Sequence, residues 1–328
     1  MSKPRVFVSR IIAEKALEKL SSEADIEVWR DELPPPYEIL TEKVRDVEGL
    51  LSLLTDNVDA ALMDAAPKLK VVSNLAVGYD NIDVLEATRR SIPVSNTPEV
   101  LTNTTADLAF TLLVSAARRV VEADKFTRAG KWKTWGPALM LGQDINHATL
   151  GIIGLGRIGK EMAKRGRGFD MTVIYYDEYP APTEIEKRFG LRRVSTLDEL
   201  LTEADFISIH VPLTEATRHL IGAKEFEKMK LTAVLVNSAR GPVVDQKALY
   251  HALKSGKIFA AGLDVTEIEP ILQDDPLLTL DNVIVLPHIA SGSVVTREKM
   301  ALMAADNIIA GLRDEQLPNC VNPEVQNE

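Results

Sequence analysis

Short apolar runs alternate with helix-type segments over the first hundred residues. Runs of β type lie at residues 5–9, 26–29, 49–54, 70–76 and 93–95. Between the first two runs, Ile12, Ala16 and Leu20 recur at the three-to-four-residue spacing of one helix face. Apolar strands separated by helices are typical of a parallel sheet covered by helices. The pattern therefore predicts a small parallel α/β domain.

A long apolar-rich segment follows. Residues 104–129 are rich in Ala, Leu and Val and end before Gly130, which predicts one long helix. The irregular segment 131–142 then carries Trp132 and Trp135. Exposed aromatic side chains are costly unless they meet another surface. We expect these two either to pack within the chain or to form a subunit contact or a pocket wall.

A second alternating series extends from residue 149 to residue 290. Its predicted strands lie at 149–153, 172–176, 206–210, 233–237, 259–263 and 283–286. Six strands separated by helices are typical of a doubly wound α/β domain. A final amphipathic helix is predicted over 296–312 and is expected to return to the first domain. The chain is thus predicted to form two doubly wound parallel-sheet domains, one from residues 1–99 with 296–328 and one from 100–295.

The turn after the first strand of this series carries the most specific motif. Gly154, Gly156 and Gly159 form G-x-G-x-x-G between that strand and a helix predicted over 160–168, and Asp177 follows the next strand. Such glycines let the backbone approach a pyrophosphate at the helix N-terminus. The carboxylate of Asp177 can accept hydrogen bonds from a ribose, and with Glu178 it would repel a 2′-phosphate. The motif predicts a dinucleotide site that prefers NAD to NADP.

Three later strand ends carry side chains suited to a keto acid. Arg240 follows the strand at 233–237, an acid near residue 269 (Glu267 or Glu269) follows that at 259–263, and His288 follows that at 283–286. In an open α/β sheet these ends meet at one edge. A guanidinium can bind a carboxylate through two donors, and an imidazole can donate a proton near neutral pH. A neighbouring carboxylate orients the imidazole and favours its charged form. Together they predict hydride transfer from nicotinamide to a ketone.

Composition narrows the range of partners. The 328 residues are 45% hydrophobic and 26% charged, and the net charge of −10 argues against a nucleic-acid partner. Cys320 is the single cysteine, so neither an intrachain disulfide nor a metal cluster is predicted. The N-terminus lacks a signal-type apolar region, and the apolar runs are too short to span a membrane. We expect a cytoplasmic protein without membrane contact.

The chain resembles the D-isomer-specific 2-hydroxyacid dehydrogenase family over nearly its whole length. The similarity rests on residues 154–159, 237–241, 262–270 and 287–290, and on the segment 74–83. The resemblance implies that Arg240, Glu269 and His288 are the catalytic residues. It also implies that main-chain N–H groups of the loop with Val77 and Gly78 bind the substrate carboxylate.

The resemblance further implies a cofactor site, a dimer and a fold. Asp264 would lie near the nicotinamide carboxamide. The full set of predicted cofactor-binding residues is Gly154, Gly156, Arg157, Ile158, Gly159, Asp177, Val211, Pro212, Thr217, Ser238, Ala239, Arg240, Asp264, His288 and Ala290. The region 104–145 corresponds to the family's homodimer contact. The expected fold is an NAD-binding Rossmann domain and a smaller flavodoxin-like substrate domain with a cleft between them.

Within the family the chain is most similar to glyoxylate and hydroxypyruvate reductases. The run from Asn96 to Thr102 with Thr105, Ala106 and Asp107 is of that type. Archaeal-type glyoxylate reductases often have basic residues where this chain has Asp177 and Glu178, which again favours NAD. A D-lactate or D-3-phosphoglycerate dehydrogenase is the alternative enzyme. An NADH-sensing transcriptional corepressor is the alternative of another class.

Overall fold

The computed structural model describes residues 3–326, which form two compact units. Unit 1 contains the described residues up to Leu101 and those from Gly292 onward, and unit 2 is Thr102–Ser291. The predicted crossings between the two domains are at 99/100 and at 295/296. The assignment of substrate binding to one unit and of cofactor binding to the other stays a prediction.

Unit 1 is built on a five-stranded parallel sheet in the order β2-β1-β3-β4-β5. This 2-1-3-4-5 order is that of flavodoxin-like folds. The strands are β1 (Arg5–Val8), β2 (Asp25–Val28), β3 (Gly49–Ser52), β4 (Val71–Asn74) and β5 (Val94–Ser95). The runs predicted at 49–54 and 70–76 are longer than β3 and β4, because their last residues form the loops at the carboxyl edge.

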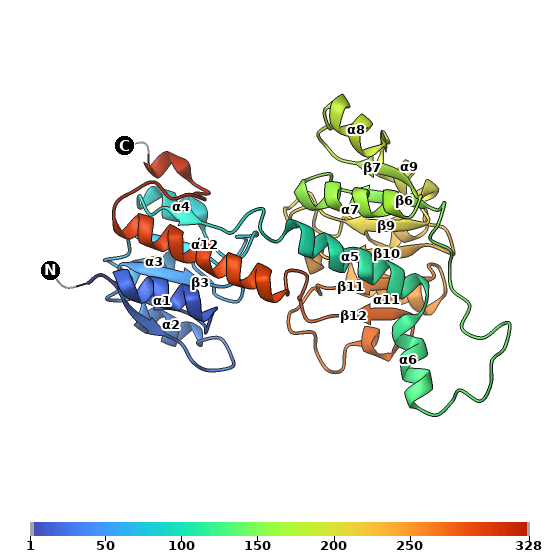
Figure 1. Ribbon diagram of the computed structural model, residues 1–328, viewed down its shortest axis with the longest axis horizontal. Coiled ribbons are helices and arrows are strands. Elements are labelled where there is room, and N and C mark those ends of the chain that lie inside the picture. Colours follow the sequence, from blue (N-terminus) through green and yellow to red (C-terminus); the bar gives the residue numbers. More distant parts are fainter. Residues whose placement is uncertain (1–2, 327–328) are drawn as a thin grey trace. The chain divides into compact units, whose positions relative to one another are not determined.

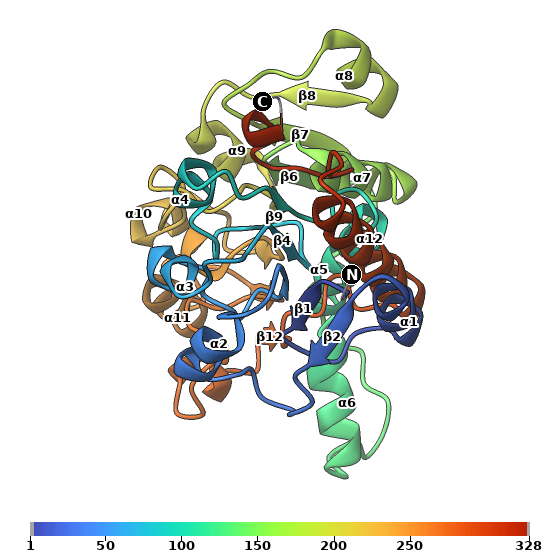
Figure 2. The same cartoon turned by 90° about the vertical axis from the view of Figure 1, so that its left-hand side faces the viewer.

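Helices cover both faces of this sheet (Figure 2). The bounds are α1 (Glu14–Glu23), α2 (Tyr37–Lys43), α3 (Ala60–Asp64), α4 (Val84–Arg89) and α12 (Val294–Leu312). Figure 2 shows α1 and α12 on one side and α2, α3 and α4 on the other. The final helix, α12, therefore belongs to unit 1. The core under α2, α3 and α4 includes Phe7, Leu40, Leu50, Leu62, Val72 and Val94.

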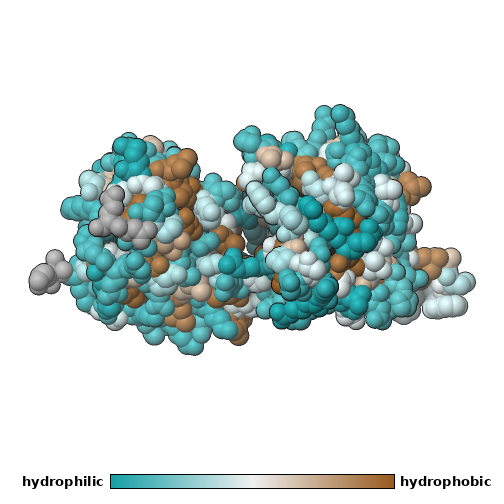
Figure 3. All heavy atoms as spheres, turned by 90° about the horizontal axis from the view of Figure 1, so that it is seen from above, coloured by the Kyte–Doolittle hydropathy of each residue, from teal (hydrophilic) through white to brown (hydrophobic). Residues whose placement is uncertain are grey.

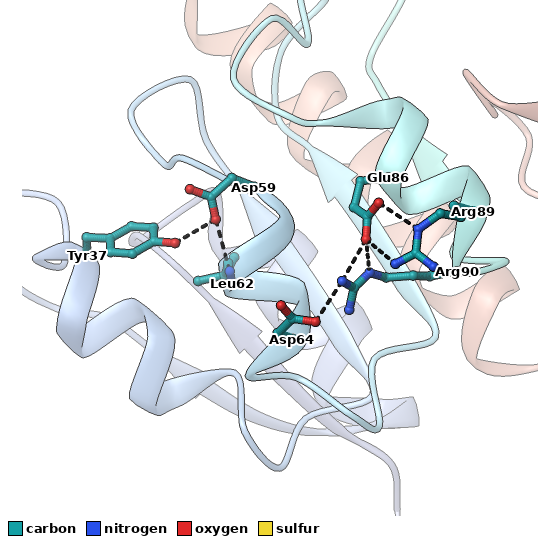
Figure 4. A network of polar contacts seen from close by, with 7 residues as sticks. All are labelled: Tyr37, Asp59, Leu62, Asp64, Glu86, Arg89 and Arg90. Atoms are coloured by element: carbon teal, nitrogen blue, oxygen red, sulfur yellow. Dashed lines mark hydrogen bonds and ion pairs between the residues drawn. The ribbon is translucent and has the colours of Figure 1, made fainter.

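A polar network joins the three helices of that second face (Figure 4). The Tyr37 hydroxyl donates to Asp59, the N-cap of α3, at 2.6 Å. This hydrogen bond raises the pKa of Tyr37 to about 12. Arg90, at the end of α4, contacts Glu86 at 2.6 Å and Asp64 of α3 at 2.7 Å. Since these groups reach solvent, the network orients the helices more than it stabilises them.

Unit 2 is built on a seven-stranded parallel sheet in the order β12-β11-β10-β9-β6-β7-β8. When the sheet is read from β8 and β6 is counted as strand 1, the order is 3-2-1-4-5-6, which is that of the Rossmann fold. The strand β12 is one further strand at the opposite edge. The strands are β6 (Thr149–Ile153), β7 (Thr172–Tyr176), β8 (Leu191–Arg193), β9 (Phe206–Ile209), β10 (Val234–Asn237), β11 (Ala260–Leu263) and β12 (Val283–Val285). The prediction of six strands was wrong because it missed β8. This edge strand has three residues, two of them exposed arginines, so it forms no apolar run.

Two helix layers enclose this sheet (Figure 1). The helices are α5 (Thr102–Ala117), α6 (Val120–Arg128), α7 (Arg157–Gly168), α8 (Thr183–Phe189), α9 (Leu197–Glu203), α10 (Ala223–Phe226) and α11 (Gln246–Lys254). One core cluster joins the sheet to α5 and α7, and another joins its opposite face to α9, α10 and α11. Burial of apolar side chains on both faces explains the continuous apolar strands of the sequence. The face of each unit visible in Figure 3 is mostly hydrophilic.

The single helix predicted over 104–129 is wrong, because the structure has two helices there. Arg119, between α5 and α6, adopts a left-handed conformation with φ 54°. The Ala117 carbonyl accepts a hydrogen bond from the Gln143 N–H at 2.9 Å. A segment that returns from later in the chain thus takes a bond that a continuous helix would make internally. The amino-acid composition of residues 104–129 does not predict that Gln143 bonds Ala117, so it does not predict the break in the helix.

The segment from α6 to Gly142, which we call the arm, exposes large apolar side chains. No residue of α6 is buried. Trp132 is 58% exposed, Trp135 77% and Leu141 63%. Trp132 and Trp135 are therefore not packed within unit 2, and the expectation of intrachain packing is wrong there. Their contact with another surface stays a prediction. Among the described residues, no helix is long and apolar enough to cross a membrane.

Candidate active site

The glycine turn between β6 and α7 has the backbone geometry that a pyrophosphate requires. Gly154 has φ +90°, which disfavours a side chain, and a methyl group at Gly159 would lie 2.2 Å from the Gly154 carbonyl oxygen. A methyl group at Gly156 would meet no protein atom within 4 Å, so the backbone there is open to a ligand. The helix begins at Arg157 rather than at residue 160 as predicted, so Arg157 and Ile158 belong to its first turn. Gly156 provides no side-chain cap, which leaves that turn suited to an anion.

Asp177 follows β7 and contacts the glycine turn. One carboxylate oxygen accepts from the Leu155 N–H at 2.7 Å and the other from the Tyr179 N–H at 3.0 Å. Each oxygen has a second lone pair, so the group can still accept bonds from a ribose. Arg193 of β8 donates to the Asp177 main-chain carbonyl at 3.2 Å. A cation that the sequence analysis missed therefore lies at the same strand end.

The loops after β9 and β10 complete the edge beside the glycine turn. Thr217 donates its hydroxyl to the Pro212 carbonyl at 2.6 Å, which closes the loop after β9. A methyl group at Gly154 would lie 2.8 Å from the Val211 side chain, so this loop packs on the glycine turn. After β10, the Ser238 hydroxyl is buried and has no partner among the described residues. A dinucleotide fits this edge, since the turn leaves room for phosphates and Ser238 offers an unused polar atom.

The loop that carries Arg240 is fixed by its neighbours. Asn237, the last residue of β10, accepts from the Ala239 N–H at 3.0 Å and donates to the Arg240 carbonyl at 2.9 Å. A methyl group at Gly241 would lie 1.8 Å from the Thr266 carbonyl oxygen. The Arg240 loop therefore packs directly on the chain that leads to Glu269.

Glu269 and His288 form a hydrogen-bonded pair. The His288 Nδ1 atom lies 2.7 Å from a Glu269 carboxylate oxygen, and the other oxygen accepts from the Thr266 N–H at 3.2 Å. The His288 side chain is 28% exposed. Its Nε2 atom has no hydrogen-bond partner among the residues that the structure describes. The ring is thus oriented on one side and available to a substrate on the other.

Asp264, the residue after β11, holds the His288 loop. It is fully buried, and its two carboxylate oxygens accept from the Ile289 and Ala290 N–H groups, each at 2.8 Å. Its main-chain carbonyl accepts from the His288 N–H at 2.9 Å. Burial raises the pKa of Asp264. The predicted cofactor contacts of Asp264 and Ala290 stay predictions beside this positioning role.

His210, directly after β9, contacts a hydroxyl group where His288 contacts a carboxylate. Its Nε2 atom contacts the Ser208 hydroxyl at 2.9 Å, and burial lowers the pKa of His210 to about 4. A neutral imidazole at neutral pH cannot act as the proton donor. A second histidine–glutamate pair, His219 with Glu267, lies on the loops after β9 and β11. His219 is nearly half exposed, and its main-chain N–H donates to the Pro242 carbonyl. The pair therefore joins the loop after β9 to the loops after β10 and β11.

Val77 and Gly78 lie in unit 1, in the loop after β4. Their main-chain N–H groups donate to no acceptor within residues 3–326. The roles of Asn237, of Arg193 and of the His219–Glu267 pair were not predicted from the sequence. A polar residue at the last position of an apolar strand must find hydrogen-bond partners nearby. This pattern in the sequence could have indicated the role of Asn237.

Known proteins share this fold. The sequence model of the D-isomer specific 2-hydroxyacid dehydrogenase NAD-binding domain matches residues 110–290. A glyoxylate reductase of Korarchaeum cryptofilum is 56% identical over 98% of this chain and 97% of its own length. A crystal structure of a protein from Thermus thermophilus has a TM-score of 0.92 and 43% identity, covering 97% of this chain and 99% of that one.

A further solved structure, an NADPH-dependent glyoxylate/hydroxypyruvate reductase from Sinorhizobium meliloti with NADP and malonate, has a TM-score of 0.86 and 35% identity. It covers 98% of this chain and 97% of its own. The match to the family covers more than half of the chain, and a full-length relative shares more than half of its residues. The chain belongs to the D-isomer specific 2-hydroxyacid dehydrogenase family and has that family's nicotinamide-cofactor domain.

Proposed function

We propose that this protein reduces small 2-keto acids to D-2-hydroxy acids, with glyoxylate or hydroxypyruvate as the preferred substrate. The observation that carries the proposal is the Glu269–His288 pair, 2.7 Å apart, with the chain that leads to Glu269 packed on the Arg240 loop. An oriented imidazole and a guanidinium are the groups that reduction of a carboxylate-bearing ketone requires. Similarity to full-length glyoxylate reductases supports the substrate class.

Each of the three side chains has one role in this proposal. Arg240 binds the substrate carboxylate and so fixes the adjacent carbonyl group. The nicotinamide, when bound, supplies the hydride that reaches the carbonyl carbon. His288 gives its Nε2 proton to the carbonyl oxygen, which becomes the hydroxyl group. Glu269 holds Nδ1 and stabilises the imidazolium before the proton leaves.

A steady-state panel tests the substrate. Glyoxylate, hydroxypyruvate, pyruvate and 3-phosphohydroxypyruvate are each assayed with NADH and with NADPH. We expect the highest kcat/KM for glyoxylate or hydroxypyruvate. A preference for pyruvate or for 3-phosphohydroxypyruvate would instead indicate a D-lactate or a D-3-phosphoglycerate dehydrogenase. Reduction of none of the four would overturn the proposal and favour the NADH-sensing corepressor.

We infer that NADH is preferred to NADPH. The carboxylate of Asp177, with Glu178 beside it, disfavours a 2′-phosphate at the end of β7. Arg193 opposes this effect, since its guanidinium lies at the same strand end and forms no ion pair among the described residues. The Sinorhizobium meliloti neighbour is NADPH-dependent, so the family admits both cofactors. The preference is therefore expected to be moderate.

Two substitutions test this balance. Asp177→Asn removes the charge but keeps the shape of the side chain, and we expect it to lower the NADH-to-NADPH ratio of kcat/KM about 10-fold, the equivalent of about 1.4 kcal/mol. Arg193→Ala should raise the same ratio. Because both ratios compare two cofactors on one protein, general damage to the loop cancels. An unchanged ratio in Asp177→Asn would remove the basis for the inferred preference.

We further propose that the protein is a homodimer whose contact includes the arm. Trp132 and Trp135 are more than half exposed, and every residue of α6 reaches solvent. Aromatic side chains are enriched at protein interfaces, where burial repays their exposure. The resemblance to the family assigns the same region, 104–145, to the dimer contact.

A further inference from the structure

Three asparagine side chains hold the loops at the carboxyl edge of the unit 1 sheet. Asn74, the last residue of β4, donates to the Gly78 carbonyl at 2.9 Å and to the Asn81 side-chain oxygen at 3.0 Å. Asn81 donates to the Leu53 carbonyl at 3.0 Å and to the Asp56 carbonyl at 2.8 Å. This chain of amides joins the loop after β3 to the loop after β4.

The third asparagine lies on a different segment. Asn96, directly after β5, donates its side-chain amide to the Val77 carbonyl at 2.7 Å. The next residue, Thr97, donates its main-chain N–H to the Ala76 carbonyl at 2.7 Å. The three successive carbonyl groups of Ala76, Val77 and Gly78 are therefore all bonded to other parts of unit 1.

These bonds fix the direction of the opposite ends of the same peptide groups. In a trans peptide the C=O and the N–H point in opposite directions. A bonded Ala76 carbonyl thus directs the Val77 N–H away from the bonded side, and a bonded Val77 carbonyl does the same for the Gly78 N–H. Both N–H groups lack an acceptor within residues 3–326. Consecutive N–H groups aimed the same way form a cradle for an anion.

We propose that Asn96 is a positioning residue that keeps the Gly78 N–H directed at the substrate carboxylate, and that Asn74 and Asn81 brace the same loop. The inference rests on the proposed function, in which the substrate is a keto acid. Without the Asn96 amide the Val77–Gly78 peptide can rotate and present its carbonyl oxygen to the carboxylate. The substrate then loses a donor and meets a like partial charge.

Asn96 is the residue to test, because Asn74 is fully buried and also accepts from Ser52, so its loss would disturb the fold. Asn96→Ala removes the donor, and Asn96→Asp replaces it with an acceptor that repels the Val77 carbonyl. Asn322→Ala is the control for stability. Asn322 is buried in unit 1 and bonds Thr88, Ile92 and Val94, not the Val77–Gly78 loop.

The measurements are KM for glyoxylate, KM for NADH, kcat, and the Kd of oxalate determined by calorimetry. We expect Asn96→Ala to raise both the glyoxylate KM and the oxalate Kd about 10-fold, since one hydrogen bond to a charged group is lost. Asn96→Asp should raise them at least as far. The KM for NADH should stay unchanged, and Asn322→Ala should lower the Tm without moving the glyoxylate KM.

Other outcomes separate this inference from the proposed function. An active wild type whose glyoxylate KM and oxalate Kd are unaffected by Asn96→Ala overturns the inference alone. A rise in the glyoxylate KM that Asn322→Ala reproduces also overturns it, because stability would then be the cause. A wild type that neither reduces a 2-keto acid nor binds oxalate overturns the proposed function, and the inference with it.

Discussion

His288 adopts a left-handed backbone conformation, φ 53°, that few residues other than glycine tolerate. Asp264 maintains it by accepting from the N–H groups of His288, Ile289 and Ala290. Strain of this kind persists only where surrounding bonds determine the backbone. The orientation of the proposed proton donor therefore depends on a buried carboxylate that does not bond the ring itself.

Glu269→Gln tests the paired imidazole. A neutral amide can still bond Nδ1, but it removes the carboxylate charge that faces the ring, so proton donation to the carbonyl oxygen should weaken. At neutral pH we expect kcat/KM to fall about 10-fold or more. Glu267→Gln is the matched control, because its side chain pairs with His219 instead. A kcat/KM in Glu269→Gln that equals the wild-type value would contradict the proposed role.

Gly241→Ala tests the contact between the Arg240 and Glu269 loops. The added methyl group would lie 1.8 Å from the Thr266 carbonyl oxygen, so the two loops must separate. We expect the free energy of unfolding to fall by about 1–3 kcal/mol and kcat/KM for the keto acid to fall as well. Gly168→Ala, where a methyl group meets no atom within 4 Å, is the control. Wild-type kcat/KM in Gly241→Ala would show that this contact does not position Arg240.

At the scale of elements, polar residues at the ends of buried strands determine the loops. Asn74 ends β4 and Asn237 ends β10, and each bonds main-chain groups of the loop that follows. His210, directly after β9, bonds back to Ser208 within its own strand. Asn74 and Asn237 are buried, so their side chains must bond close by, and the loop supplies the partners.

The His210 environment predicts a dependence of stability on acid. In the folded chain burial lowers the pKa of His210 to about 4, whereas an unfolded histidine takes up its proton near pH 6.5. Between these values the unfolded chain binds more protons, so acidification destabilises the fold. We expect His210→Gln to reduce the stability lost between pH 7 and pH 5 by up to about 2 kcal/mol.

Urea unfolding at the two pH values measures this difference. His251→Gln is the control, because His251 is exposed on α11. An equal loss of stability in wild type and in His210→Gln would show that other groups cause the acid sensitivity.

At the scale of the whole molecule, the chain forms two units with different strand orders, and the second leaves the arm exposed. If the arm forms the dimer contact, Trp132→Ser combined with Trp135→Ser should increase the monomer fraction in sedimentation velocity. Loss of buried aromatic area at an interface costs about 2 kcal/mol or more per anchor residue. Leu231→Ser, at an exposed position of unit 2 outside the arm, should leave the assembly unchanged. A double variant that sediments as the wild type does would remove the arm from the contact.

The apolar pattern by itself determined both parallel sheets, because a strand buried on two faces must be apolar along its length. It also located Arg240, Glu269 and His288 at one sheet edge, since parallel strands end there together. The break between α5 and α6, the edge strand β8 and the amides that hold the Val77–Gly78 loop were decided only by the tertiary structure. Each depends on a hydrogen-bond partner that is distant in the chain: Gln143 for Ala117, β7 for β8, and Asn96 for Val77. The local sequence indicates which side chains of a segment are buried. The hydrogen-bond partners of its main-chain N–H and C=O groups depend on the tertiary fold.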